Sequence, residues 1–156
     1  ALHDRLARLD VGLDAEGRVL GSKTLEALAH AGYRLVIISG TLDLLLHTLL
    51  PDPPFDDIYA NHVGFDDDGK ISHWRATPFD MEGKAAAFRA VAQAWRFPLD
   101  RCAYVGDSAN DLWVAREAGF TLAFNPKSPE LVAVADVTVR SSNLRSILRH
   151  FLDRSD

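Results

Sequence analysis

The sequence predicts an α/β fold, in which helices flank a parallel β-sheet. Three observations favour this class. Short apolar runs, typical of strands in a parallel sheet, recur at 34–38, 102–105 and 120–124, and a fourth strand is predicted over 136–140. Segments whose apolar residues have helical spacing separate these runs. Glycine, proline and N-capping residues mark the junctions, and such alternation builds a parallel sheet with right-handed crossovers.

Two helices are predicted before the first strand. Leucines recur at helical spacing and predict an amphipathic helix at Leu2, Leu6, Leu9 and Leu13. Ser22 is a candidate N-cap for a helix over 23–31, and Gly32 suits the position after it. The apolar strand 34–38 is then predicted to end at Ser39-Gly40-Thr41, before a short helix over 42–50.

Turn residues predict a β-hairpin in the middle of the chain. Asp66-Asp67-Asp68-Gly69-Lys70 separates the strand residues 63–65 from 71–74, and we interpret this hairpin as an insertion on the sheet. The remaining helices alternate with the later strands. They are predicted over 83–95, over 112–118, from Ser128-Pro129 onward and over 144–151.

Composition limits the class of protein. The chain has 156 residues, of which 47% are hydrophobic and 25% charged, so it suits one globular domain and not a disordered chain, a collagen or a coiled-coil rod. Its net charge of −5 argues against nucleic acid or an anionic membrane as partner, although a local cationic pocket for phosphate stays possible. No pattern reports on oligomeric state.

Cysteine usage and hydropathy predict a cytoplasmic protein. The single cysteine, Cys102, excludes an internal disulfide and favours a reducing compartment. The most apolar stretch, 42–50, is short and carries Asp43 and His47, so it cannot span a bilayer. Residues 1–20 contain acids and bases and lack the apolar region of a signal peptide.

Polar residues follow the strands where a parallel sheet binds ligands, at its carboxyl edge. The hydroxyl of Ser39 and the N–H groups of Gly40 and Thr41 form a candidate anion site before a helix. Asp107 and Asp111, with Asn110 between them, suit a hard cation such as Mg²⁺. Lys84 begins a helix and can bring an ammonium to the same phosphate, so together these groups describe a phosphoryl-transfer site.

Each piece also has a purely structural interpretation. Ser39-Gly40-Thr41 can be a turn with a helix cap, and Lys84 a solvated surface lysine. Asp107 can cap the next helix, and Asp111 can be a surface acid. The combination carries more weight than any single motif.

The combined pattern resembles the haloacid dehalogenase superfamily, and most closely its phosphoserine-phosphatase-like members. The resemblance runs from about Ser22 to Phe151. The segment 36–40 looks like the second motif of that family, Gly83-Lys84 like the third and 104–112 like the fourth, with 45 residues from Ser39 to Lys84 and 23 from Lys84 to Asp107. The hairpin is similar to one in phosphoserine phosphatases. The resemblance implies a Rossmann-like core.

The resemblance also implies a role for each site residue. Ser39 would donate its hydroxyl to a phosphoryl oxygen, with help from the N–H groups of Gly40 and Thr41. Lys84 would neutralise phosphate charge and orient the nucleophile. Asp107 would ligate Mg²⁺. Asp111 would ligate it through water or orient Lys84, and Asn110 would touch the substrate.

Two departures from the family pattern bear on function. The first motif, an Asp-x-Asp sequence that carries the nucleophile, is not found. Its nearest candidates, Asp10 and Asp14, are four positions apart on a helical pattern, so the nucleophile is expected outside this chain. Residues 1–20 are interpreted as the remnant of a cap or of a connecting helix, and 21–156 as the core. Thr41 stands where phosphoserine phosphatases more often have glycine, which leaves the substrate open.

These features predict a Mg²⁺-dependent phosphomonoester hydrolase acting on a small phosphorylated metabolite such as phosphoserine. The main alternative is a non-catalytic protein of the same fold that binds phosphate or Mg²⁺. A third possibility is a structural module in which the motifs are relics of the fold.

Overall fold

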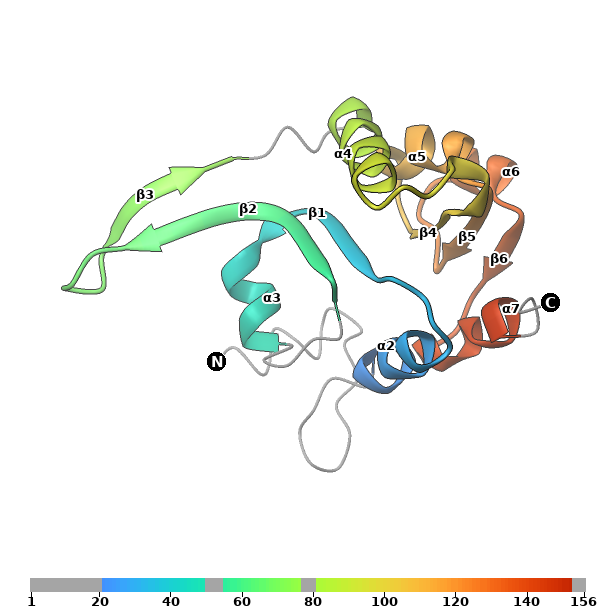
Figure 1. Ribbon diagram of the computed structural model, residues 1–156, viewed down its shortest axis with the longest axis horizontal. Helices are drawn as coiled ribbons and strands as arrows, with labels where there is room; N and C mark the ends of the chain where they lie inside the picture. Colours follow the sequence, from blue (N-terminus) through green and yellow to red (C-terminus); the bar gives the residue numbers. More distant parts are fainter. Residues whose placement is uncertain (1–20, 50–54, 77–80, 153–156) are drawn as a thin grey trace. The chain divides into compact units, whose positions relative to one another are not determined.

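The computed structural model describes residues 21–49, 55–76 and 81–152. The predicted leucine-patterned helix and the interpretation of residues 1–20 lie outside these ranges. The chain divides into two compact units, and each is described by itself. The first unit draws its described residues from 1–37, 43–58 and 141–156, and the second unit comprises 38–42 and the described part of 59–140. Figure 1 labels their helices and strands.

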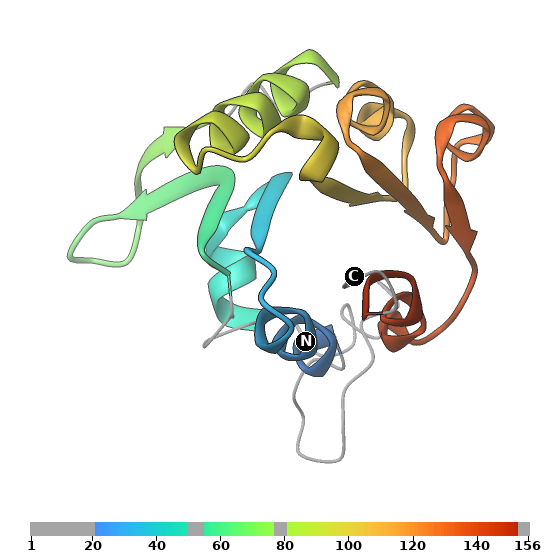
Figure 2. The ribbon, with the colours of Figure 1, turned by 45° about the vertical axis from the view of Figure 1, so that its right-hand side comes forward.

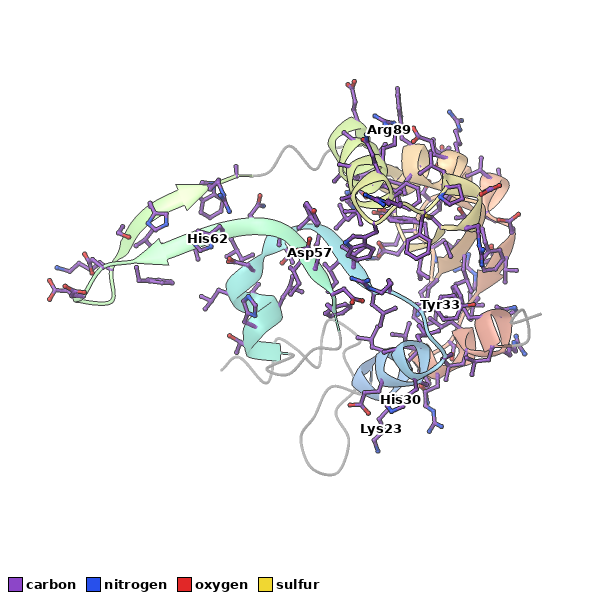
Figure 3. All side chains as sticks on the ribbon, in the orientation of Figure 1. Lys23, His30, Tyr33, Asp57, His62 and Arg89 are labelled. Carbon is purple, nitrogen blue, oxygen red and sulfur yellow. The ribbon has the colours of Figure 1, made fainter. Side chains whose placement is uncertain are left out.

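Helices dominate the first unit. Helix α2 (Gly21–His30) packs against the 3₁₀ helix η4 (Leu144–Ile147), which continues into α7 (Arg149–Leu152), as Figure 2 shows. Gly32 has a φ of +90°, which fits the predicted glycine after the helix. The hydroxyl of Tyr33, labelled in Figure 3, donates to the carbonyl of Phe151 at 2.9 Å. The two rings meet edge to face, so α7 is anchored to the residues after α2.

A parallel sheet forms the body of the second unit. Its order is β4-β5-β6, with bounds Ala103–Gly106, Phe120–Phe124 and Val137–Val139. The helices α4 (Met81–Ala94), α5 (Leu112–Glu117) and α6 (Pro129–Val134) lie side by side along this sheet (Figure 2). Apolar residues from helices and strands close the core between them, with two buried clusters at Ala85, Phe88 and Val114 and at Ala115, Ala123 and Leu131. These elements confirm the predicted α/β class.

A second sheet contains β1 (Val36–Leu42), β2 (Asp57–Phe65) and β3 (Ile71–Arg75), in that order. Strands β2 and β3 are antiparallel and form the predicted hairpin. Its turn is closed by Asp66, whose backbone N–H donates to the carbonyl of Lys70 at 2.8 Å, and by Gly69 at a φ of +76°. Helix α3 (Asp43–Leu49) follows β1, close to its predicted place.

The first strand differs from its prediction in length. The sequence predicts that it ends at Ser39-Gly40-Thr41, but β1 continues through these residues to Leu42. These residues remain extended because β2 pairs with β1, and Asn61 of β2 donates its side-chain amide to the carbonyl of Gly40 at 2.6 Å. Pairing between strands has therefore overridden the local turn signal of Ser-Gly-Thr.

The sheet arrangement also differs from a single parallel sheet. In the described part of the chain, β1 pairs with the hairpin and β4 pairs with β5, but β1 and β4 are not paired with each other. Residues 36–39 are accordingly only half-buried, whereas the apolar run predicted a strand buried on both faces. The last helical segment is also divided, into η4 and α7.

Candidate functional site

The loop after β4 and the first turn of α4 bring two charged groups together. Lys84 lies near the start of α4, and Asp111 ends the 3₁₀ turn η3 (Ala109–Asp111) that follows β4. Nζ of Lys84 lies 2.7 Å from Oδ1 of Asp111, and the two side chains are only 9% and 3% exposed. Lys84 is therefore not a solvated surface lysine, and Asp111 is not a surface acid. A charged pair this deeply buried needs further polar partners.

The carboxylate of Asp111 receives those partners from its own loop and strand. The hydroxyl of Tyr104 also donates to Oδ1, at 2.7 Å. The backbone N–H groups of Asp107 and Ser108 donate to Oδ2, at 2.9 and 3.1 Å. Burial raises the pKa of this carboxyl, but the hydrogen bonds from Lys84 and Tyr104 outweigh burial and hold the pKa below its usual value. The carboxyl of Asp111 therefore stays ionised, and each of its two oxygens accepts hydrogen bonds.

Tyr104 is a member of this site that the sequence pattern did not single out. Tyr104 lies on β4, two residues before Gly106. Its side chain therefore points to the same face of the sheet as position 106. Its ring packs edge to face against Phe88 of α4. Burial and then the negative charge of Asp111 raise the pKa of the phenol, so Tyr104 keeps its proton and acts as a donor. The period-two pattern of the strand is the signal that could have found it.

Asp107 has different surroundings. Its side chain is 46% exposed, and its Oδ2 atom lies 2.7 Å from Nζ of Lys127. The backbone N–H of Lys127 also donates to the carbonyl of Asp107, at 2.7 Å. Lys127 follows β5, the neighbour of β4, at the same edge of the sheet. The sequence analysis did not single out Lys127, although the rule that ligand-binding residues follow the strands could have indicated it.

The other predicted residues are placed as follows. Asn110 is half-buried, and its side-chain oxygen accepts a short hydrogen bond from the hydroxyl of Ser108. Ser39, Gly40 and Thr41 lie within β1, where the N–H of Thr41 donates to Oγ of Ser39 at 3.2 Å. This N–H therefore points to a side chain of its own strand. The prediction had placed it at the N-terminus of a helix, available to an anion.

The structure links the two halves of the predicted site through apolar packing. Ile38, one residue before Ser39, packs on the buried cluster that contains Ala85, one residue after Lys84. Within the described ranges, no hydrogen bond joins residues 39–41 to Lys84, Asp107, Asn110 or Asp111. The residues predicted to bind phosphate therefore fall into two parts, a hydrogen-bonded one around Asp111 and a second one on β1.

The described residues include no group of three or more His, Cys, Asp or Glu side chains that could hold a metal ion. The chemistry of Asp107 nevertheless fits a hard cation, because a half-exposed carboxylate offers oxygen ligands to Mg²⁺. The ammonium of Lys127 lies against one of its oxygens. Asp111 fits direct ligation less well, since both of its oxygens already accept hydrogen bonds.

The comparison with protein families decides the assignment. Residues 4–116 match the model of the haloacid dehalogenase-like hydrolases. The chain belongs to this family. Among curated relatives, a phosphoserine phosphatase of Idiomarina loihiensis is 33% identical over 129 residues, covering 82% of this chain and 58% of the relative. A phosphoserine phosphatase of Streptomyces coelicolor is 32% identical, covering 95% of this chain and 38% of the relative.

A solved structure of a substrate-bound phosphoserine phosphatase complex is similar as well. It aligns with a TM-score of 0.72 and 27% identity, covering 83% of this chain and 61% of that one. The chain thus spans less than two thirds of the length of these relatives. Among the helices that the structure describes, none has the length and apolar character needed to cross a membrane.

Proposed function

We propose that this chain provides the phosphate-binding and metal-binding part of a phosphatase that hydrolyses a small phosphomonoester such as phosphoserine. The observation that carries the proposal is the buried pair of Lys84 and Asp111 beside the half-exposed Asp107. A lysine held this rigidly offers its charge to a phosphate without having to reorganise. The phosphoserine phosphatases that the chain resembles support the choice of substrate.

The proposed roles follow from the surroundings of each residue. Lys84 neutralises charge on the phosphoryl group, and Asp111 with Tyr104 holds the ammonium in place. Asp107 would hold Mg²⁺, which when bound supplies positive charge against the transferring phosphoryl group. Ser39 and Gly40 would contribute a hydroxyl and an N–H group to the phosphate, and Thr41 would add its N–H in place of the hydrogen bond that it donates to Oγ of Ser39. Asn110 contacts the substrate.

The nucleophile is expected from a carboxylate outside the described residues. Asp10 and Asp14 are the nearest candidates in the sequence, but their spacing does not match the Asp-x-Asp pattern. A carboxylate nucleophile would divide hydrolysis into two steps, with a phosphorylated carboxyl group between them. The cytoplasmic location inferred from the single cysteine also stays a prediction.

The test uses the protein at its native length with phosphoserine and Mg²⁺. We expect Lys84→Met and Asp107→Asn each to lower turnover by about 100-fold or more, because the first removes the positive charge that neutralises the phosphate and the second removes a carboxylate ligand of Mg²⁺. Lys70→Met is the control, since the side chain of Lys70 lies at the hairpin tip and is 78% exposed. Wild-type turnover in the Asp107→Asn variant would contradict the proposal.

The main alternative is a protein that binds phosphate or Mg²⁺ without catalysis, since Lys84 and Asp107 could hold these ions without a nucleophile. Calorimetry separates the two. Binding of inorganic phosphate and Mg²⁺ by the native protein, with no hydrolysis of phosphoserine or of other small phosphate esters, would replace the proposed phosphatase by this alternative.

A further inference from the structure

Lys127 lies against the carboxylate to which the proposed function assigns the metal. Its ammonium is 2.7 Å from Oδ2 of Asp107, and its own side chain is 78% exposed. Mg²⁺ binds carboxylate oxygens at about 2.1 Å. An ammonium and a metal ion on the same oxygen would repel each other at such short range.

The loop that carries Lys127 holds it in this position. The loop begins after β5 with Asn125, which has a φ of +44° and donates its backbone N–H to the carbonyl of Val139 at 2.8 Å. It ends at Ser128, whose Oγ accepts the N–H of Leu131 at 3.3 Å and caps α6. Both ends are therefore fixed, and the backbone hydrogen bond from Lys127 to the carbonyl of Asp107 joins the middle of the loop to the site.

Lys127 differs from Lys84 in what its charge can do. Lys84 is buried and bound to a carboxylate that is already occupied by other donors. Lys127 is exposed, and its exposed ion pair with Asp107 contributes at most about 1 kcal/mol. Another cation can therefore replace the ammonium of Lys127 beside Asp107.

We propose that Lys127 is an internal counter-ion of Asp107, which a divalent cation must displace or overcome in order to bind. The inference rests on the proposed function, because it concerns the same metal site. Lys127 then lowers the affinity of the site for Mg²⁺ and keeps the carboxylate of Asp107 paired when no metal is bound. Lys127 is a positioning residue in this scheme and takes no part in the chemistry of phosphate transfer.

The experiment is a calorimetric titration of the native-length protein with MgCl₂ at low ionic strength. We expect Lys127→Met to bind Mg²⁺ about threefold to fivefold more tightly than the wild type, because the variant removes one exposed positive charge next to the metal. Lys127→Arg should keep wild-type affinity. Lys70→Met is the matched control, since Lys70 is also 78% exposed and pairs with an aspartate, Asp68, away from this site.

Salt gives a second readout. The difference between wild type and Lys127→Met should shrink as NaCl is raised from about 0.05 M to about 0.5 M, because salt screens exposed charges. Equal or weaker Mg²⁺ binding by Lys127→Met would overturn the inference and leave the proposed function standing. Absence of Mg²⁺ binding in the wild type would overturn the proposed metal site, and the inference with it.

Discussion

The carboxylates of Asp107 and Asp111 stand four positions apart in one loop, yet burial, partners and charge distinguish them. The side chain of Asp111 is 3% exposed and accepts hydrogen bonds from Lys84, Tyr104 and two backbone N–H groups. The side chain of Asp107 is 46% exposed and pairs with Lys127, which is itself exposed. Asp111 is buried and held by fixed hydrogen-bond donors, whereas Asp107 is accessible to solvent.

This difference assigns separate tasks to two residues of the same type. A carboxylate surrounded by fixed donors organises its neighbours, and removing it leaves a buried positive charge without compensation. A half-exposed carboxylate contributes little to stability but remains accessible to a ligand. Three variants and one change of pH test how far the roles of Asp107 and Asp111 differ.

The largest effect on stability is expected from Asp111→Ala. Removing the buried partner of Lys84 should lower the free energy of unfolding by about 3–5 kcal/mol. Asp107→Ala, the matched control in the same loop, should lower it by at most about 1 kcal/mol. Urea unfolding followed by circular dichroism measures both values. Similar losses in the two variants would remove the distinction between the two carboxylates.

The effect of pH should come next in size, because protonation removes the charge of Asp111 but leaves its side chain in place. The pKa of this carboxyl is lowered in the folded state, so the unfolded state binds its proton more readily. The resulting stabilisation is fully present above the ordinary aspartate pKa of about 3.9 and is lost as pH falls through the lower folded value.

Urea unfolding between about pH 5 and pH 3 measures this loss. The Asp111→Asn variant cannot ionise at this position and should show a flatter dependence of unfolding free energy on pH. An unchanged slope in that variant would mean that other carboxyl groups account for the acid sensitivity.

Gly106→Ala is expected to have a smaller but clear effect. A Cβ atom at Gly106 would lie 2.7 Å from Oδ2 and 2.8 Å from Cγ of Asp111, which donors on both oxygens hold in place. Relieving this overlap should cost about 1–3 kcal/mol of unfolding free energy. Ala103→Gly, on the same strand but with an exposed side chain, is a control for the change in backbone freedom. A stability loss no larger than that of the control would show that Asp111 can move aside.

The sequence predicted the elements of this site better than the contacts within it. The apolar runs and turn residues placed β4, β5 and the second hairpin strand β3 close to their observed bounds, because burial pattern and turn chemistry are local properties. The first hairpin strand was predicted over 63–65, and β2 begins six residues earlier, at Asp57. The motif around Asp107 and Asp111 pointed to a charged site, and one of the two roles considered for Asp111 was to orient Lys84, which the 2.7 Å contact supports.

What the sequence could not show depends on groups that are distant along the chain. The continuation of β1 through Ser39 depends on its pairing with β2. Lys127 belongs to a loop that has no ligand-binding motif of its own, and only the adjacency of β4 and β5 brings it to Asp107. Which aspartate is buried is likewise a property of the assembled site.

Tyr104→Phe should have the smallest effect of the four. Phenylalanine keeps the ring, its burial and the edge-to-face contact with Phe88, so the variant removes only the hydroxyl that donates to Oδ1 of Asp111. The same oxygen keeps the ammonium of Lys84, so no buried acceptor is left without a donor, and the loss should be about 1 kcal/mol of unfolding free energy.

If Tyr104 only stabilises the fold, kcat of the native-length protein for phosphoserine should stay at the wild-type value. If the hydroxyl also fixes the direction of Lys84, kcat should fall by a few-fold while KM changes little, because the ammonium is then less well placed for the transition state than for the bound substrate. A loss of about 3 kcal/mol or more would instead mean that Asp111 depends on the hydroxyl for its ionised state, and that Lys84 and the backbone donors are insufficient without it.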